Sequence, residues 1–192
     1  MKHLLVILSL VFTSTGAFAQ NETSKFKIGD QAPTFSGQDQ NGQTYSSEEL
    51  RAQGDKVLVI FYRGYWCPYC QNHLKELDEQ FKSFQSKGIQ VLVISPEKPE
   101  KMEETSSELE NEIPLIYDQD NTIMNSFGVA FELEDSFSKW TLKRVDEYNA
   151  VGNRVLPVPA TYLIGTDGKI EYVHYDPNYH KRSNLEDLLN SL

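Results

Sequence analysis

Cysteine is scarce in this sequence of 192 residues, where Cys67 and Cys70 are the only two. Two cysteines supply neither a four-cysteine zinc site nor the framework of a disulfide-rich scaffold. A disulfide between them would close a very small loop, and such loops contribute little to stability. The pair, in the stretch FYRGYWCPYC, therefore indicates chemistry rather than architecture.

Positive charge is also in short supply. The chain carries 18 lysines and arginines against 28 acidic residues, which gives a formal net charge of −10 at pH 7. An acidic chain without a basic cluster repels phosphate backbones and anionic lipid surfaces. We therefore expect neither nucleic acid nor a membrane surface among its partners.

Long apolar runs are absent except for LLVILSLVF near the start, which is too short to span a bilayer as a helix. It follows Lys2 and precedes small residues that end in the A-x-A-like sequence Ala17, Phe18, Ala19. This pattern is typical of a secretory signal peptide. We predict that residues 1–19 are removed, that residues 20–192 form a single domain, and that the protein is exported to the periplasm or secreted.

Apolar patterning predicts an α/β fold. Continuous apolar or β-branched runs at 56–62, 89–95 and 113–118 are typical of strands buried on both faces of a sheet. Residues 68–87 and 99–111 carry the apolar spacing of helices. This alternation predicts a parallel βαβ core, with the cysteine motif where its first strand passes into a helix.

Smaller elements are expected on either side of this core. Two turn dipeptides flanked by β-rich runs predict hairpins, Asn41-Gly42 and Asp167-Gly168. The remaining predictions are helices: a short one at 123–127, an insertion at 131–150 and a final amphipathic helix with leucines between 185 and 192.

The predicted position of Cys67 at the start of a helix favours its thiolate, because unpaired N–H groups and the helix dipole stabilise negative charge there. Pro68 fits the first helical position, where a missing N–H costs nothing. A C-x-x-C pair at this place can hold either a dithiol or an exchangeable disulfide. Two electrons then enter or leave in each cycle.

Neighbouring side chains have functional and ordinary interpretations. Arg63 either lowers a thiol pKa and polarises a peroxide oxygen, or only adds solubility as most surface arginines do. Trp66 either shields the sulfurs and shapes a docking surface, or packs against the core. Tyr62 is expected to pack, and Pro159 precedes a predicted strand, where proline sits at a strand start, an edge or a bulge.

A metal site is a further alternative. His73 with His174 or His180 could complete a copper or zinc site around the two cysteines. The shortage of ligands instead predicts that His73 is an exposed residue on the first turns of the helix. We expect no bound metal and no cofactor.

The motifs resemble a known family. A buried strand, W-C-P-x-C at the head of a helix, a βαβ crossover, VPATYLI and a D-G-K-I hairpin are similar in order to the thioredoxin fold. With GDQAPTF, LVISPE and YDPNYHKR, the chain from about Lys27 onward resembles the peroxiredoxin-like branch of the alkyl hydroperoxide reductase and thiol-specific antioxidant (AhpC/TSA) family.

The resemblance implies a thioredoxin-like central mixed β-sheet flanked by helices, with an N-terminal hairpin and a helical insertion before the strand that follows Pro159. It also implies that Pro159 is a cis-proline beside the cysteine pair, and that the Val158 backbone is presented to a docking substrate. Typical peroxiredoxins carry P-x-x-x-T-x-x-C, which places Arg63 at the proline, Cys67 at the threonine and Cys70 at the peroxidatic cysteine. Their later arginine falls at Pro159 and is absent here.

The two patterns disagree on the nucleophile, since the thioredoxin pattern assigns attack to Cys67 and the peroxiredoxin pattern to Cys70. Helix geometry favours Cys67.

The first functional hypothesis is a thiol peroxidase that reduces hydroperoxides through a Cys67–Cys70 disulfide and is reduced by an external thiol, such as a thioredoxin-like protein.

The second hypothesis is an exported thiol–disulfide oxidoreductase acting on protein disulfides, which dock against Trp66, Val158 and Pro159. The third is a copper or zinc carrier.

Overall fold

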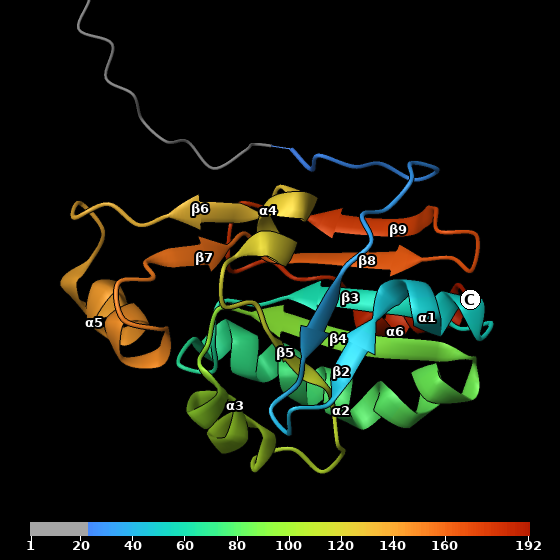
Figure 1. Ribbon diagram of the computed structural model, residues 1–192, viewed down its shortest axis with the longest axis horizontal. Helices are drawn as coiled ribbons and strands as arrows, with labels where there is room; N and C mark the ends of the chain where they lie inside the picture. The colour runs from blue at the N-terminus through green and yellow to red at the C-terminus, as the bar shows by residue number, and fades with distance from the viewer. Residues whose placement is uncertain (1–22) are drawn as a thin grey trace, which may run out of the picture.

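The computed structural model describes residues 23–192, so the predicted signal peptide lies outside the described residues. Its centre is a five-stranded sheet in the order β5-β4-β3-β8-β9 (Figure 1). The first three strands in that order are mutually parallel, whereas β8 is antiparallel to both β3 and β9. The strands are β3 (Lys56–Phe61), β4 (Ile89–Ser95), β5 (Leu115–Tyr117), β8 (Ala160–Ile164) and β9 (Ile170–Tyr175).

The sequence of β3 explains its central position. Val57 to Phe61 are all buried, and alternate side chains point to opposite faces of the sheet. Leu58 and Ile60 join one hydrophobic cluster, while Val57, Val59 and Phe61 join the other. A strand buried on both faces needs apolar residues at every position, and the predicted strand is confirmed.

Helices cover both faces of the sheet. The cluster that contains Leu58 also includes buried side chains of α2 (Pro68–Ser86), α3 (Pro99–Ser106), α5 (Lys139–Tyr148) and α6 (Leu185–Asn190). The opposite cluster includes α4 (Thr122–Phe127) and a partly buried leucine of α1 (Ser47–Ala52). The predicted mixed sheet flanked by helices is therefore confirmed. In the described part of the chain, no helix has the length and apolarity needed to cross a membrane.

Two small ladders accompany the main sheet. β1 (Ser36–Gln38) and β2 (Thr44–Ser46) form the predicted N-terminal hairpin around Asn41-Gly42. β6 (Ala130–Glu132) and β7 (Val155–Pro157) form a second two-stranded sheet, which lies with α5 at one end of the molecule (Figure 1).

Two predicted helices are shorter than expected. The insertion at 131–150 is helical only in α5, because its first residues pair with β7 as part of β6. The helix expected over 99–111 ends at Ser106, and the chain after it is anchored instead by Asp78, whose carboxylate accepts the N–H groups of Glu110 and Asn111 at 2.7 and 2.9 Å.

The implied cis-proline is wrong, because no peptide bond among the described residues is cis. Val158 donates its N–H to the carbonyl of Val129 at 2.8 Å, and β8 begins directly after Pro159. The trans form of an X–Pro bond is also intrinsically favoured by about 0.5–1 kcal/mol.

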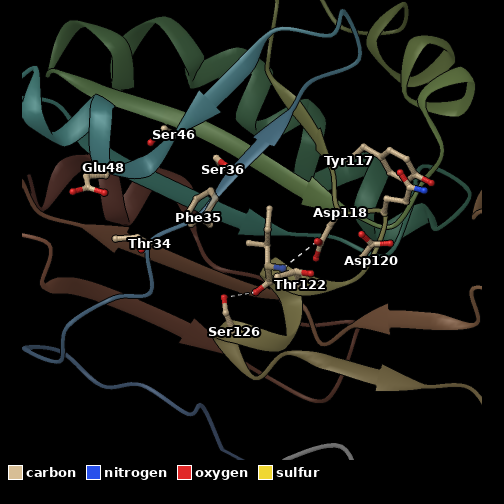
Figure 2. Close-up of a pocket in the computed structure, with 12 residues that line it drawn as sticks. Thr34, Phe35, Ser36, Ser46, Glu48, Tyr117, Asp118, Asp120, Thr122 and Ser126 are labelled. Carbon is tan, nitrogen blue, oxygen red and sulfur yellow. Dashed lines mark hydrogen bonds between the residues drawn. The ribbon is translucent and has the colours of Figure 1, made fainter.

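A polar hollow of about 540 Å³ opens between the N-terminal hairpin and α4 (Figure 2). At its floor the buried Asp118 accepts the backbone N–H groups of Ile123 and Met124, at 3.0 and 2.8 Å. The Asp118 carboxylate therefore satisfies donors at the start of α4 that have no partner within the helix. This hollow lies on the face of the sheet opposite to α2, away from the cysteines.

Replacing Asp118 should destabilise the fold without affecting the cysteines. We expect Asp118→Ala to lower the free energy of unfolding by about 2 kcal/mol, since it leaves buried N–H groups without their charged acceptor. Urea denaturation measures this, with Asp120→Ala as the matched control because Asp120 is exposed. Equal stability of the two variants would contradict the assigned role.

Candidate active site

One edge of the central sheet brings the candidate residues together. The parallel strands β3 and β4 end at this edge, where Phe61 pairs with Ile94. β8 starts here at Ala160, which pairs with both Phe61 and Tyr175, the last residue of β9. The loops after β3, β4 and β9 and the segment before β8 therefore meet here, although their residues are far apart in sequence.

Cys67 is the N-cap residue of α2, with an extended backbone (φ −93°, ψ 116°) and Pro68 as the first helical residue. Its carbonyl accepts the N–H groups of Cys70 and Gln71 at 2.9 and 3.0 Å, which closes the first turn. This confirms the predicted location of the motif at the junction of a buried strand and a helix. Both cysteines are buried, free thiols.

The two sulfurs differ in acidity. The pKa of Cys67 is lowered to about 6, chiefly by the hydrogen bond from the Cys70 side chain, with further help from the Cys70 N–H and the charges of Arg63 and Arg182, against the opposing effect of burial. The pKa of Cys70 is raised well above its usual value by burial and by its interaction with Cys67. At neutral pH the pair therefore consists of a Cys67 thiolate and a Cys70 thiol.

A cavity of about 370 Å³ opens in front of Cys67, and Cys70 is not among the residues that line it. Its walls come from the motif loop, from α5, from the β7–β8 connection and from the segment after β9. They are mainly aromatic rings and prolines, including Trp66, Tyr69, Trp140, Pro157, Pro159 and Tyr179. Cys67 is thus the sulfur that a molecule entering this cavity would meet.

Arg63 lines the same cavity and is only 6% exposed. Its guanidinium carbon lies 5.1 Å from the centre of the Trp66 ring and 4.4 Å from that of Tyr179. Within residues 23–192 it has no ion pair, and its buried Nε has no hydrogen-bond partner. The interpretation of Arg63 as a solubilising surface residue is therefore wrong.

Of the three predicted docking residues, Trp66 and Pro159 line the cavity and Val158 does not. Trp66 is buried, lines the cavity and packs edge-to-face on Trp140 with ring centres 5.6 Å apart. Pro159 also lines the cavity. Val158 has a buried side chain that does not line the cavity, and its N–H is occupied by Val129.

His73 is buried, and the prediction that it is exposed is wrong. The side chain faces the segment before α6, where Nε2 lies 3.2 Å from Oγ of Ser183, which in turn contacts Thr161 at 2.9 Å. Burial, with the charges of Arg182 and His174, lowers the pKa of His73 to about 3.

The other two histidines of the described residues, His174 and His180, have different neighbours. His180 stacks on Tyr69 with ring centres 4.4 Å apart, and His174 pairs with Thr161 in the sheet. Within the described residues, no group of three or more His, Cys, Asp or Glu side chains is placed to hold a metal ion.

Two residues of the site were missed by the sequence analysis. Arg182 places Nη2 3.5 Å from the sulfur of Cys70, and Glu97 is a fully buried carboxyl group in the loop after β4. Both occur in motifs used for the resemblance, LVISPE and YDPNYHKR. Only the meeting of β3, β4 and β9 at one sheet edge indicates that Arg182 lies beside Cys70 and that Glu97 contacts the motif loop at Tyr62 and Tyr65.

Comparison with known proteins agrees with this architecture. The AhpC/TSA family model matches residues 28–173. Peroxiredoxin Bcp of Escherichia coli K12 is 33% identical over 163 residues, which are 85% of this chain and 92% of the relative. Thiol-disulfide oxidoreductase ResA of Bacillus subtilis is 27% identical over 168 residues, which are 87% of this chain and 77% of the relative.

The crystal structure of a PrxQ mutant from Xylella fastidiosa has the same fold, with a TM-score of 0.68 at 15% identity over 88% of this chain and 96% of that one. Both the family model and the Bcp relative cover most of the sequence, and the cysteine pair lies inside the matched region. The chain belongs to the AhpC/TSA family.

Proposed function

We propose that the protein is a thiol peroxidase in which Cys67 attacks the hydroperoxide and Cys70 resolves the product. The Cys67 thiolate attacks the terminal oxygen, an S–O bond forms and the O–O bond breaks. The released oxygen anion takes a proton from solvent and leaves as an alcohol, or as water when the substrate is hydrogen peroxide. The thiol of Cys70 then displaces water from the Cys67 sulfenic acid and forms the disulfide. An external dithiol returns both sulfurs to the reduced state.

The observation that carries this proposal is the buried Arg63 guanidinium without an acidic partner. Burying a charge without an ion pair is costly, and here the two aromatic faces and the nearby Cys67 thiolate offset the cost. Negative charge develops on oxygen as the O–O bond breaks, so a cation fixed in the cavity beside Cys67 would stabilise the transition state. The 33% identical relative is named a peroxiredoxin, which supports the same reaction class.

The choice of Cys67 as nucleophile departs from the peroxiredoxin pattern, which assigns attack to Cys70. Three features support it: Cys67 is the helix N-cap, it lines the cavity, and its pKa is lowered to about 6. Cys70 is shielded from the cavity and holds its proton. The thiolate is the reactive form of cysteine, so Cys67 would react first.

Protein thiol–disulfide exchange is the second candidate, and the aromatic cavity favours it. Trp140 at the rim is 52% exposed, as expected of a surface that receives an apolar peptide segment. A 27% identical relative is named a thiol-disulfide oxidoreductase. Export, proposed from the signal-like residues 1–19, would place such an enzyme where disulfides form.

Stopped-flow oxidation of the reduced protein by hydrogen peroxide separates the two functions. Trp66 fluorescence reports the reaction, and we expect it to be much faster than oxidation of a free thiol. Cys67→Ser should abolish it, whereas Cys70→Ser should react once and stop at the sulfenic acid. A rate equal to that of a simple thiol would reject the peroxidase and leave disulfide exchange.

The pH dependence of alkylation tests whether Cys67 is a thiolate at neutral pH. The rate of reaction of Cys67 with iodoacetamide should rise through an inflection at about pH 6 and level off above it, because only the thiolate reacts. Cys70→Ala removes the principal hydrogen bond and should move the inflection upward, toward that of an ordinary cysteine. An ordinary inflection already in the unsubstituted protein would contradict the assignment.

Arg63→Gln should lower the rate constant for hydrogen peroxide by about 10²-fold, since it removes the buried cation from the cavity. Arg144→Gln is the matched control, because that guanidinium also lies over an aromatic ring, Trp140, but is partly exposed and paired with Glu147. Rates within twofold for the two variants would show that Arg63 has no part in the chemistry.

A further inference from the structure

The chain between β9 and α6 forms a strap, residues 176–184, that packs against the first turns of α2. His180 of the strap stacks on Tyr69 with ring centres 4.4 Å apart, and Oγ of Ser183 lies 3.2 Å from Nε2 of His73. These contacts fix the backbone on both sides of Arg182. The Arg182 side chain is thereby held beside the second cysteine.

The guanidinium of Arg182 is directed at a sulfur rather than at a carboxylate. Nη1 donates to the backbone carbonyls of Tyr179 and Lys181, the second at 2.8 Å, while Nη2 donates to the sulfur of Cys70 at 3.5 Å. Within the described residues Arg182 forms no ion pair, and its buried Nε has no hydrogen-bond partner. Asp176, an acidic residue of the same strap, pairs with Lys181 instead.

Cys70 has no other source of positive charge in contact with its sulfur. It is 1% exposed, does not line the cavity and belongs to a hydrophobic cluster, so water does not stabilise an anion there. His73, one turn further along α2, is neutral near pH 7, because burial lowers its pKa to about 3. In the part of the chain that the structure describes, Arg182 is thus the cationic side chain hydrogen-bonded to this sulfur.

The dithiol–disulfide cycle places negative charge on the Cys70 sulfur twice. When the disulfide forms, the S–H bond of Cys70 breaks as its sulfur attacks Cys67. When the disulfide is reduced, the reductant attacks Cys67, the sulfur that lines the cavity, and the electron pair of the S–S bond passes to Cys70. Both steps are faster when the thiolate of Cys70 is better stabilised.

We propose that Arg182 is the catalytic residue that stabilises this negative charge on Cys70, both when the disulfide forms and when it is reduced. In disulfide formation the Cys70 sulfur bonds to the Cys67 sulfur, the S–O bond breaks, and the Cys70 proton joins the released hydroxide as water. In reduction, a thiolate of the external dithiol bonds to Cys67, and Cys70 leaves as a thiolate beside Arg182. The second thiol of the reductant then displaces the Cys67 thiolate, and its proton passes to Cys70.

The two arginines of the site therefore act on different sulfurs. Arg63 lines the cavity in front of Cys67, whereas Arg182 does not line it and contacts Cys70 from the strap. The charge of Arg182 contributes least to the lowered pKa of Cys67. Loss of Arg182 should slow the steps in which Cys70 reacts and leave the first attack by Cys67 nearly unchanged. A residue that only anchors the strap would affect both.

The proposal rests on the dithiol–disulfide cycle of the proposed function but not on the identity of the oxidant. One equivalent of dithiobis(nitrobenzoic acid), an aromatic disulfide, therefore tests it without peroxide. Cys67 attacks this reagent and releases one nitrothiobenzoate, and Cys70 then displaces the second from Cys67. Stopped-flow absorbance resolves the two releases as two phases, so a failure of the peroxidase proposal in the hydrogen peroxide assay would leave this test intact.

Arg182→Gln should slow the second phase by at least about 10-fold and leave the first within about twofold, since a hydrogen bond to a charged sulfur is lost. Reduction of the preformed disulfide by dithiothreitol should slow by a similar factor. The matched control is Lys181→Gln, which removes an exposed positive charge from the same strap and should change neither phase. An unchanged second phase, or equal slowing of both phases, in Arg182→Gln would overturn the proposal.

Arg182→Lys provides the test if Arg182→Gln cannot be purified as a folded protein. Lysine keeps the positive charge but lacks the planar group that reaches both the strap carbonyls and the sulfur. We expect a second phase slower than that of the unsubstituted protein, with a first phase that is unchanged and so shows the motif to be intact. A second phase as fast as that of the unsubstituted protein would reject the assigned hydrogen bond.

Discussion

The hydrogen bond between the two thiol side chains is the interaction on which the site depends. It makes the sulfurs unequal, because the same proton that stabilises negative charge on Cys67 is retained by Cys70. The helix start and the nearby arginines add to this difference, but they act on a pair already polarised by proximity. In the proposed mechanism Cys67 attacks and Cys70 resolves, within a single turn of α2.

The arrangement of the sheet places the other residues of the site around the cysteine pair. β3, β4 and β9 run in one direction and β8 runs in the opposite direction. The loops carrying Arg63, Glu97 and Arg182, which follow β3, β4 and β9, therefore meet Pro159, which precedes β8, at one edge. They occupy different sides of the cysteines, with Arg63 and Pro159 facing the cavity and Glu97 behind the motif loop. This division separates the cavity in front of Cys67 from the buried carboxyl group that holds the motif loop.

Sequence patterns predicted the elements and the motif but not the long-range contacts of the site. Continuous apolar runs identified β3 and β4, and Asp167-Gly168 identified the β8–β9 hairpin, because these features follow from local chemistry. The burial of His73 and the short α5 were not predicted, because they depend on partners distant in sequence, Ser183 and β7. The cis Val158–Pro159 bond was implied by the family resemblance alone, whereas the local preference of an X–Pro bond is trans. Arg182 and Glu97 escaped notice for the same reason.

The central claim is that Cys67 is the sulfur oxidised first. The most direct measurement is mass spectrometry of Cys70→Ser protein treated with one equivalent of hydroperoxide in the presence of dimedone, which traps sulfenic acids. The account predicts a dimedone adduct on the peptide that contains Cys67, and no adduct on Cys70 when Cys67→Ser protein is treated in the same way. An adduct on Cys70 in the second experiment, with none on Cys67 in the first, would contradict it.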